Sequence, residues 1–199
     1  MAAAAIFPPS YVTEDEYLER EEKAKAKSEW INGRIYAMAG ASDNHGAISP
    51  ILSRIVGNHL SNLRSPCRFR DTDTKVQIKG GPAFLYADGS VSCPPNFVNR
   101  RQGTIDNPKV VFAILSPSTE AYDRGDKFMM YASLPSLEQY VFISSTRPQV
   151  EVWTRIPGGW SFEKMIEGVV EVASISLKLD LEMLYEDVLF ENGPSDDPA

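Results

Sequence analysis

The stretch Lys109-Val110-Val111-Phe112-Ala113-Ile114-Leu115-Ser116-Pro117-Ser118-Thr119 decides the fold. Its apolar residues run without alternation, which is typical of a central strand that is covered on both faces. The Ser-Pro-Ser-Thr segment that follows indicates a turn and a helix start, and we expect a helix over 119–133. With helices on both sides of a mixed sheet, the chain is expected to be α/β or α+β.

A capped helix and a hairpin are expected near the beginning of the chain. Thr13 and Glu16 have the spacing of a capping box, which predicts a helix that runs to about Lys25. Asn32-Gly33 can supply the two positive φ angles of a type I′ turn, so residues 29–38 read as a hairpin.

Asp43 or Asn44 is expected to cap a second helix that runs to about Leu63. Pro50 lies one to two turns inside it, where it removes a backbone donor. The helix therefore either starts late or kinks at Pro50, and the sequence leaves both possibilities open.

Clean alternation predicts a strand over 71–79, and Gly80-Gly81-Pro82 turns the chain into a strand over 83–93. The remaining chain reads as short strands and one short helix. The strands are expected at 137–144, 149–155, 159–167 and 169–173, and the helix at 180–188.

Composition describes an ordinary soluble globular protein. The 199 residues suffice for one sizeable domain, which we expect over 11–191 between a disordered segment at 1–10 and a disordered acidic tail at 192–199. No apolar run is long enough to span a membrane, and no export signal is evident. We therefore expect a cytoplasmic protein in which Cys67 and Cys93 are reduced, buried thiols.

The net charge of −7 argues against a chain that coats nucleic acid non-specifically. A local basic cleft remains possible, and the alternative is that the basic residues are scattered and solvated. The basic residues concerned are Arg68, Arg70, Lys75, Lys79, Arg100, Arg101 and Lys109. A homodimer is expected only from the general frequency of symmetric pairs.

Four segments carry a resemblance to a known family: Ser28-Glu29-Trp30-Ile31-Asn32-Gly33, Tyr86-Ala87-Asp88, Ile114-Leu115-Ser116-Pro117-Ser118-Thr119 and Tyr122-Asp123-Arg124-Gly125-Asp126-Lys127-Phe128. They resemble the bacterial "putative restriction endonuclease" domain family, also called Uma-type. The resemblance runs from about Tyr11 to Val188. It implies the restriction-endonuclease-like PD-(D/E)XK fold, a mixed central sheet flanked by helices, and Mg²⁺-dependent cleavage of DNA.

The resemblance also assigns roles to particular residues. It implies that Asp88 is a metal ligand and that Lys127 places a positive charge beside the nucleophile. The family usually has Val-Glu-Val-Leu-Ser where this chain has Phe112-Ala113-Ile114-Leu115-Ser116, so Ala113 stands where a second carboxylate is expected. The family's Tyr-Pro-Asp reads Tyr86-Ala87-Asp88 here, a milder departure.

Plainer interpretations stand beside these roles. Asp88 would otherwise be a charge at a strand edge or end, and Lys127 an exposed partner of Asp123 four residues earlier. Glu29 matches an acidic family position, but a solvated carboxylate at the hairpin would look the same.

Three more positions have weaker claims. Asp73 matches a recurrent acidic position of the family, and both Asp73 and its neighbour Lys75 also fit the polar face of an ordinary strand. His45, near a helix start, is most simply a cap or a polar contact.

Two functions therefore remain open. The chain is either a weak or specialised Mg²⁺-dependent DNA endonuclease in which Glu29 or Glu120 replaces the missing ligand, or a non-catalytic nuclease-like module that binds nucleic acid or a protein partner. The distance from Asp88 to another carboxylate would separate them, because a shared metal needs both groups close together.

Overall fold

The computed structural model describes residues 11–38, 40, 42–79 and 82–190. The two terminal segments for which we expect disorder, and the Gly80-Gly81 part of the predicted turn, lie outside these residues. Within the described chain, no helix is long and apolar enough to cross a membrane.

Short strands dominate the described chain. The helical elements are α1 (Glu14–Lys23), α2 (Asp43–Asn62), α3 (Glu120–Tyr122), η1 (Asp123–Lys127), α4 (Phe128–Ala132), η2 (Ala173–Ile175) and α5 (Leu181–Leu184). The strands are β1 (Ser28–Ile31), β2 (Arg34–Ala37), β3 (Arg68–Asp71), β4 (Lys75–Ile78), β5 (Ala83–Tyr86), β6 (Gly89–Ser92), β7 (Phe97–Asn99), β8 (Thr104–Ile105), β9 (Val110–Leu115), β10 (Gln139–Ser144), β11 (Val150–Ile156), β12 (Gly159–Met165), β13 (Val169–Val172) and β14 (Leu177–Asp180).

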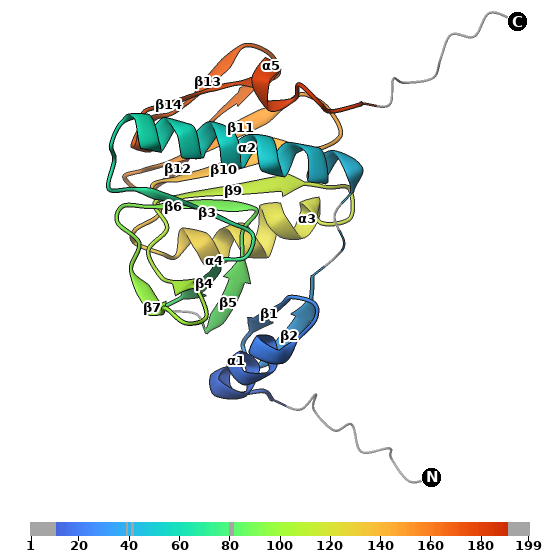
Figure 1. Ribbon diagram of the computed structural model, residues 1–199, viewed down its shortest axis with the longest axis vertical. Helices are drawn as coiled ribbons and strands as arrows, with labels where there is room; N and C mark the ends of the chain where they lie inside the picture. Colours follow the sequence, from blue (N-terminus) through green and yellow to red (C-terminus); the bar gives the residue numbers. More distant parts are fainter. Residues whose placement is uncertain (1–10, 39, 41, 80–81, 191–199) are drawn as a thin grey trace, which may run out of the picture.

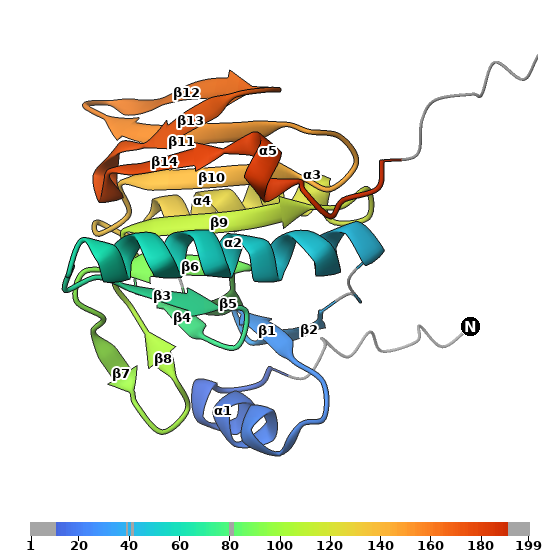
Figure 2. The same cartoon turned by 45° about the horizontal axis from the view of Figure 1, so that its top comes forward.

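The strands form two six-stranded sheets and a small two-stranded one. The central sheet has the order β12-β11-β10-β9-β6-β3, the hairpin sheet has the order β2-β1-β5-β4-β8-β7, and β13 pairs with β14. Helix α2 lies across one face of the central sheet and α4 lies behind the other (Figures 1 and 2). The expected α+β class, with a mixed sheet between helices, is confirmed, whereas the second large sheet was not expected.

Strand β9 lies at the centre of the molecule. It pairs in parallel with β10 and antiparallel with β6, and all six of its residues are buried. Val110, Phe112 and Ile114 join the apolar cluster under α2, while the alternate residues join the cluster that contains Phe128 of α4 and Leu85 of the hairpin sheet. The prediction of a central strand covered on both faces is confirmed.

The early local signals are also confirmed. The Thr13 hydroxyl accepts a hydrogen bond from the Glu16 backbone N–H, and the Glu16 carboxylate accepts one from the Thr13 N–H. Asn32 and Gly33 have φ angles of 49° and 83°, as a type I′ turn requires, and they join β1 to β2.

Helix α2 does not start late. It begins at Asp43 and runs through Pro50 to Asn62. Its N-cap is Ser42, whose hydroxyl accepts the His45 N–H at 3.4 Å, and not Asp43 or Asn44.

A single strand over 71–79 is wrong. The chain turns after Asp71, because the Asp71 carboxylate accepts the Asp73 N–H and its carbonyl accepts the Thr74 N–H. Such a side-chain bond favours a turn over continued pairing. Strands β3 and β4 consequently belong to different sheets.

A single strand over 83–93 is wrong for a related reason. Strand β5 belongs to the hairpin sheet and β6 to the central sheet, so the chain crosses between sheets at Ala87 and Asp88. Polar side chains replace the strand ladder at this crossing. The Glu29 carboxylate accepts the Tyr86 N–H, and the Asp88 carboxylate accepts the Ile114 N–H.

The predicted helix over 119–133 is broken into α3, η1 and α4. Gly125 in η1 has non-helical backbone angles (φ −99°, ψ −108°), and the Phe128 N–H bonds the Asp123 carbonyl five residues earlier. This wider turn has Asp123 and Lys127 as its buried residues. Wide turns of this kind recur at functional sites.

The second half of the chain follows the expected order. Strands β10, β11, β12 and β13 lie where strands were predicted, although the helix expected over 180–188 spans only Leu181–Leu184. The short strands β7, β8 and β14 were not predicted.

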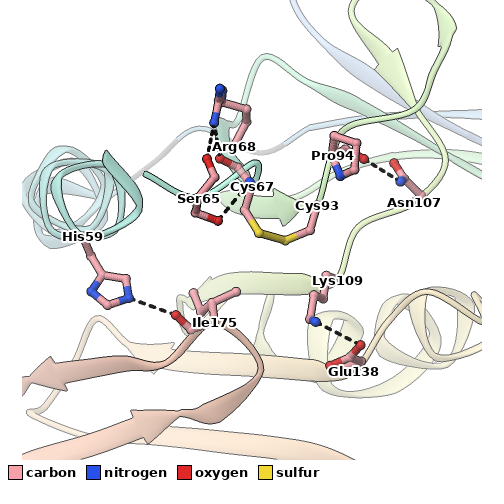
Figure 3. The surroundings of a disulfide bond; sticks show 10 residues. All are labelled: His59, Ser65, Cys67, Arg68, Cys93, Pro94, Asn107, Lys109, Glu138 and Ile175. Atoms are coloured by element: carbon pink, nitrogen blue, oxygen red, sulfur yellow. Dashed lines mark hydrogen bonds and ion pairs between the residues drawn. A yellow bond between two sulfur atoms is a disulfide. The ribbon is translucent and has the colours of Figure 1, made fainter. Parts of the chain in front are cut away.

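The expectation of two reduced, buried thiols is wrong. Cys67 and Cys93 form a disulfide, and both residues are only partly buried. The antiparallel β3–β6 register pairs Arg68 with Ser92. Cys67, just before Arg68, therefore lies opposite Cys93, just after Ser92 (Figure 3). This long-range pairing is not visible in the sequence.

Candidate functional site

A cleft of about 1200 Å³ opens between the β1–β2 hairpin, the first half of α2 and the α3–η1–α4 segment. It is rich in ionisable side chains. Among the described residues, its acidic and basic lining groups are the carboxylates Glu29, Asp71, Asp88, Asp123 and Asp126, the lysines Lys27 and Lys127, and His45. Three residues singled out from the sequence, Glu29, Asp88 and Lys127, thus reach the same cleft.

Asp88 lies at the crossing between the two sheets. Its Oδ2 atom accepts the Ile114 N–H at 2.6 Å, which fixes the carboxylate against β9. The β6–β9 register pairs Gly89 with Phe112, and extending it by one residue sets Asp88 opposite Ala113. The Ala113 methyl group carries no donor or acceptor and is packed in the apolar cluster with Phe128.

His45 holds the other oxygen of Asp88. Its Nε2 atom lies 3.1 Å from Asp88 Oδ1, and both side chains are about one-fifth exposed. The hydrogen bond to Asp88 is the largest influence on the His45 pKa and raises it, while burial acts in the opposite direction. The simple expectation of a polar contact is met, but the partner lies at the centre of the cleft.

Glu29 is fully engaged. It is 4% exposed, and its Oε1 atom lies 2.8 Å from Lys127 Nζ and accepts the Tyr86 N–H at 3.0 Å. Its Oε2 atom accepts the Tyr122 hydroxyl at 2.8 Å. The interpretation of Glu29 as a solvated hairpin carboxylate is therefore wrong.

Lys127 stays charged in its buried position. Burial alone would lower its pKa, but Glu29 and Asp123 raise it above the ordinary lysine value. Asp123 Oδ1 lies 3.7 Å from Lys127 Nζ, and burial raises the pKa of this aspartate. The pair that the sequence suggested between Asp123 and Lys127 exists, but it is buried and secondary to Glu29.

Asp73 and Lys75 lie outside the cleft. The Asp73 side chain is 80% exposed and pairs with Lys27 at 2.8 Å. Lys75 is buried with its Nζ atom 5.3 Å from the centre of the Tyr17 ring, and burial lowers its pKa. Lys75 packs against α1 and not beside Asp88.

Glu120 is also occupied elsewhere. It accepts a hydrogen bond from Arg124 at 2.7 Å. Arg124 in turn binds both oxygens of the buried Glu151, at 2.9 and 3.1 Å. The two acids considered as replacements for the missing ligand, Glu29 and Glu120, are thus both held by cations.

The seven basic residues between 68 and 109 lie outside this cleft. None of them is among the described residues that line the cleft. Lys79 pairs with Asp106, Arg101 with Glu22 and Lys109 with Glu138. Arg70 and Arg100 both lie over the Phe97 ring, so two of the seven share one aromatic contact.

The donor set around Asp88 does not fit a Mg²⁺ ion. Mg²⁺ is usually held by one or two carboxylates with open oxygen lone pairs and by water. Here both Asp88 oxygens already face donors, and the facing position 113 offers no oxygen. Across the described residues, no group of three or more His, Cys, Asp or Glu side chains is arranged to hold a metal ion.

Comparisons with known proteins give the chain its family. The Uma2 family, described as "Putative restriction endonuclease", matches residues 14–184. The uncharacterized protein slr1290 of Synechocystis sp. is 36% identical over 94% of this chain and 97% of its own length. A second Synechocystis protein, sll1609, also uncharacterized, is 32% identical over 73% of this chain and 81% of its own length.

A solved structure shares the fold. The crystal structure of a "putative nuclease" from Anabaena variabilis superposes with a TM-score of 0.71 at 21% identity, and it covers 89% of this chain and 99% of that one. This likeness extends the shared architecture over nearly the whole described chain. By the extent of its family match and of its similarity to slr1290, the chain belongs to the Uma2 family of restriction endonuclease-like proteins.

Proposed function

We propose that this chain is a nuclease-fold protein whose Mg²⁺-dependent cleavage of DNA is weak or lost. The proposal combines the family and the fold with the site as it stands. Cleavage of a phosphodiester needs a metal ion to polarise the phosphate and activate water. A site with one carboxylate that is already saturated binds such an ion poorly, so weak Mg²⁺ binding is part of the proposal.

The observation that carries the proposal is the β6–β9 register, which sets Asp88 opposite Ala113 when it is extended by one residue. A second carboxylate at position 113 would share a metal ion with Asp88, whereas a methyl group cannot. The two acids considered as replacements are both held by cations, Glu29 by Lys127 and Glu120 by Arg124. Ala113 is thus the simplest physical cause of lost metal affinity.

Two unpaired hydroxyl groups support the same interpretation. Within the described chain, the buried Tyr131 and Tyr140 hydroxyls have no hydrogen-bond partner. Both belong to the apolar cluster that contains Ala113, and Phe142, which is paired with Ala113, packs on the Tyr140 ring. Unsatisfied buried hydroxyls are costly. A carboxylate at position 113 would bring an acceptor into this cluster.

A cleavage assay tests the proposal. Purified wild-type protein, Asp88→Asn and Ala113→Glu are incubated with supercoiled plasmid in Mg²⁺ or Mn²⁺. We expect wild type to nick DNA no faster than Asp88→Asn, and Ala113→Glu to exceed both. Strong wild-type cleavage that Asp88→Asn abolishes would refute the proposal and would show that another acid completes the site.

A second candidate function, a non-catalytic module that binds a protein partner, is favoured by the charge of the cleft. Five carboxylates and two lysines are among its described lining residues, and Lys27 is already paired with Asp73. Such a surface repels phosphates in the absence of a metal ion and attracts basic side chains. Tighter binding of a DNA duplex than of a Lys- and Arg-rich peptide would exclude this candidate.

A further inference from the structure

The two oxygens of Asp88 are held by groups of different kinds. The donor to Oδ2 is the backbone N–H of Ile114, which cannot leave without disturbing β9. The group at Oδ1 is the His45 imidazole, a side chain that can rotate away. Access of a cation to Asp88 therefore depends on His45.

The position of His45 is itself well defined. Ser42 caps α2 by accepting the His45 N–H, and the Asn44 side chain donates a hydrogen bond to the Ser145 carbonyl at 2.9 Å. Ser145 follows β10 and donates its own N–H to the Leu115 carbonyl at the end of β9. The start of α2 is thus tied to the same end of the central sheet that carries Asp88.

We propose that His45 blocks metal binding at Asp88, because its side chain competes directly with divalent cations for Oδ1. The inference deepens the proposed function, since it takes Asp88 as the remaining acid of the ancestral metal site. It assigns part of the poor fit to Mg²⁺ to His45 on α2, in addition to Ala113 on β9. A cation must displace the imidazole before it can bind.

If His45 were a metal ligand instead, removal of its side chain would change the metal affinity in the opposite direction. Imidazole is a good ligand for transition-metal ions such as Fe²⁺ and Zn²⁺, so a ligating His45 would increase the affinity for such an ion. As a competing partner of Asp88, His45 decreases the metal affinity, because a hydrogen bond to a charged carboxylate is lost when the metal binds. The effect of removing the side chain therefore has a different sign for the two roles.

The test is a titration of the folded protein with Mn²⁺. Binding is measured by calorimetry and by the electron paramagnetic resonance signal of free Mn²⁺. Wild type is compared with His45→Ala and with His59→Ala. His59 is a matched control because it is the other histidine of the chain and also lies on α2, but its Nε2 atom bonds the Ile175 carbonyl at 2.9 Å, beside the disulfide (Figure 3).

We expect Mn²⁺ affinity to rise about tenfold or more in His45→Ala, the scale of one hydrogen bond to a charged group. His59→Ala should match wild type, and Asp88→Asn added to His45→Ala should remove the gain. Thermal melting checks that each variant folds. If His45→Ala does not, His45→Asn, which is polar but too short to hold Asp88 in the same way, replaces it.

Two results would overturn the proposal that His45 blocks metal binding. The first is weaker Mn²⁺ binding in His45→Ala than in wild type, which would make His45 a ligand. The second is equal binding, or equal absence of binding, in the two proteins. The titration does not depend on DNA cleavage. Cleavage of DNA by the wild-type protein would therefore contradict the proposed function, and the titration would still decide the role of His45.

Discussion

Ala113 is packed against Phe142 in the strand register and shares an apolar cluster with Phe128. We expect Ala113→Glu to be less stable than wild type without metal, by about 2 kcal/mol, because a carboxylate replaces a buried methyl group. With Mn²⁺, part of this loss should return, since a ligand that binds only the folded state stabilises it.

Thermal melting of Ala113→Glu and Ala113→Gln, with and without Mn²⁺, measures the effect. Glutamine has nearly the same size and removes the charge, so it separates crowding in the cluster from metal binding. Equal stabilisation of both variants by Mn²⁺, or of neither, would mean that position 113 does not face a metal site.

Single residues were predictable where a motif carried them. Asp88, Lys127 and Glu29 were singled out by the family resemblance and reach the same cleft. Asp73 and Lys75 were singled out in the same way but lie elsewhere, because the turn after Asp71 separates them from the cleft. His45 received only a generic interpretation, since its contact with Asp88 depends on how α2 packs on the central sheet.

At the scale of elements, the β1–β2 hairpin carries Glu29 into the cleft, and its turn depends on Gly33. Gly33 has φ +83°, and a Cβ atom there would lie 2.2 Å from the Tyr11 ring. We expect Gly33→Ala to lower stability by about 1 kcal/mol from the backbone angle alone. Displacement of Tyr11 should add to this loss.

Gly158, in the β11–β12 turn, is a matched control. It has the same φ of +83°, but open space surrounds the position of a Cβ atom. Urea denaturation should show a larger loss for Gly33→Ala than for Gly158→Ala. Similar losses would mean that the Tyr11 contact contributes nothing to holding the hairpin.

Helices and strands were predictable where the signal was local. The predictions failed where a residue distant in the sequence redirected the chain. The capping box of α1, the Asn32-Gly33 turn and the apolar run of β9 depend on neighbours in sequence, and all three are confirmed. The strand over 83–93 was wrong because Glu29 and Ile114, far along the chain, engage the crossing at Tyr86 and Asp88.

At the scale of the whole molecule, the Cys67–Cys93 disulfide links the start of β3 to the segment after β6, at the edge of the central sheet. The cysteines are 26 residues apart, so the bond closes a loop of moderate length in the unfolded chain. Closing such a loop removes entropy from the unfolded state and contributes roughly 3 kcal/mol.

We therefore expect reduction of the wild-type protein to lower its melting temperature by roughly 6 to 12 °C, the shift that about 3 kcal/mol produces in a chain of this size. The double variant Cys67→Ser/Cys93→Ser should melt near the reduced wild type, and a reductant should not change it further. This control separates loss of the bond from other effects of the reductant. Equal melting of oxidised and reduced wild type would show that pairing of β3 with β6 alone holds this edge of the sheet.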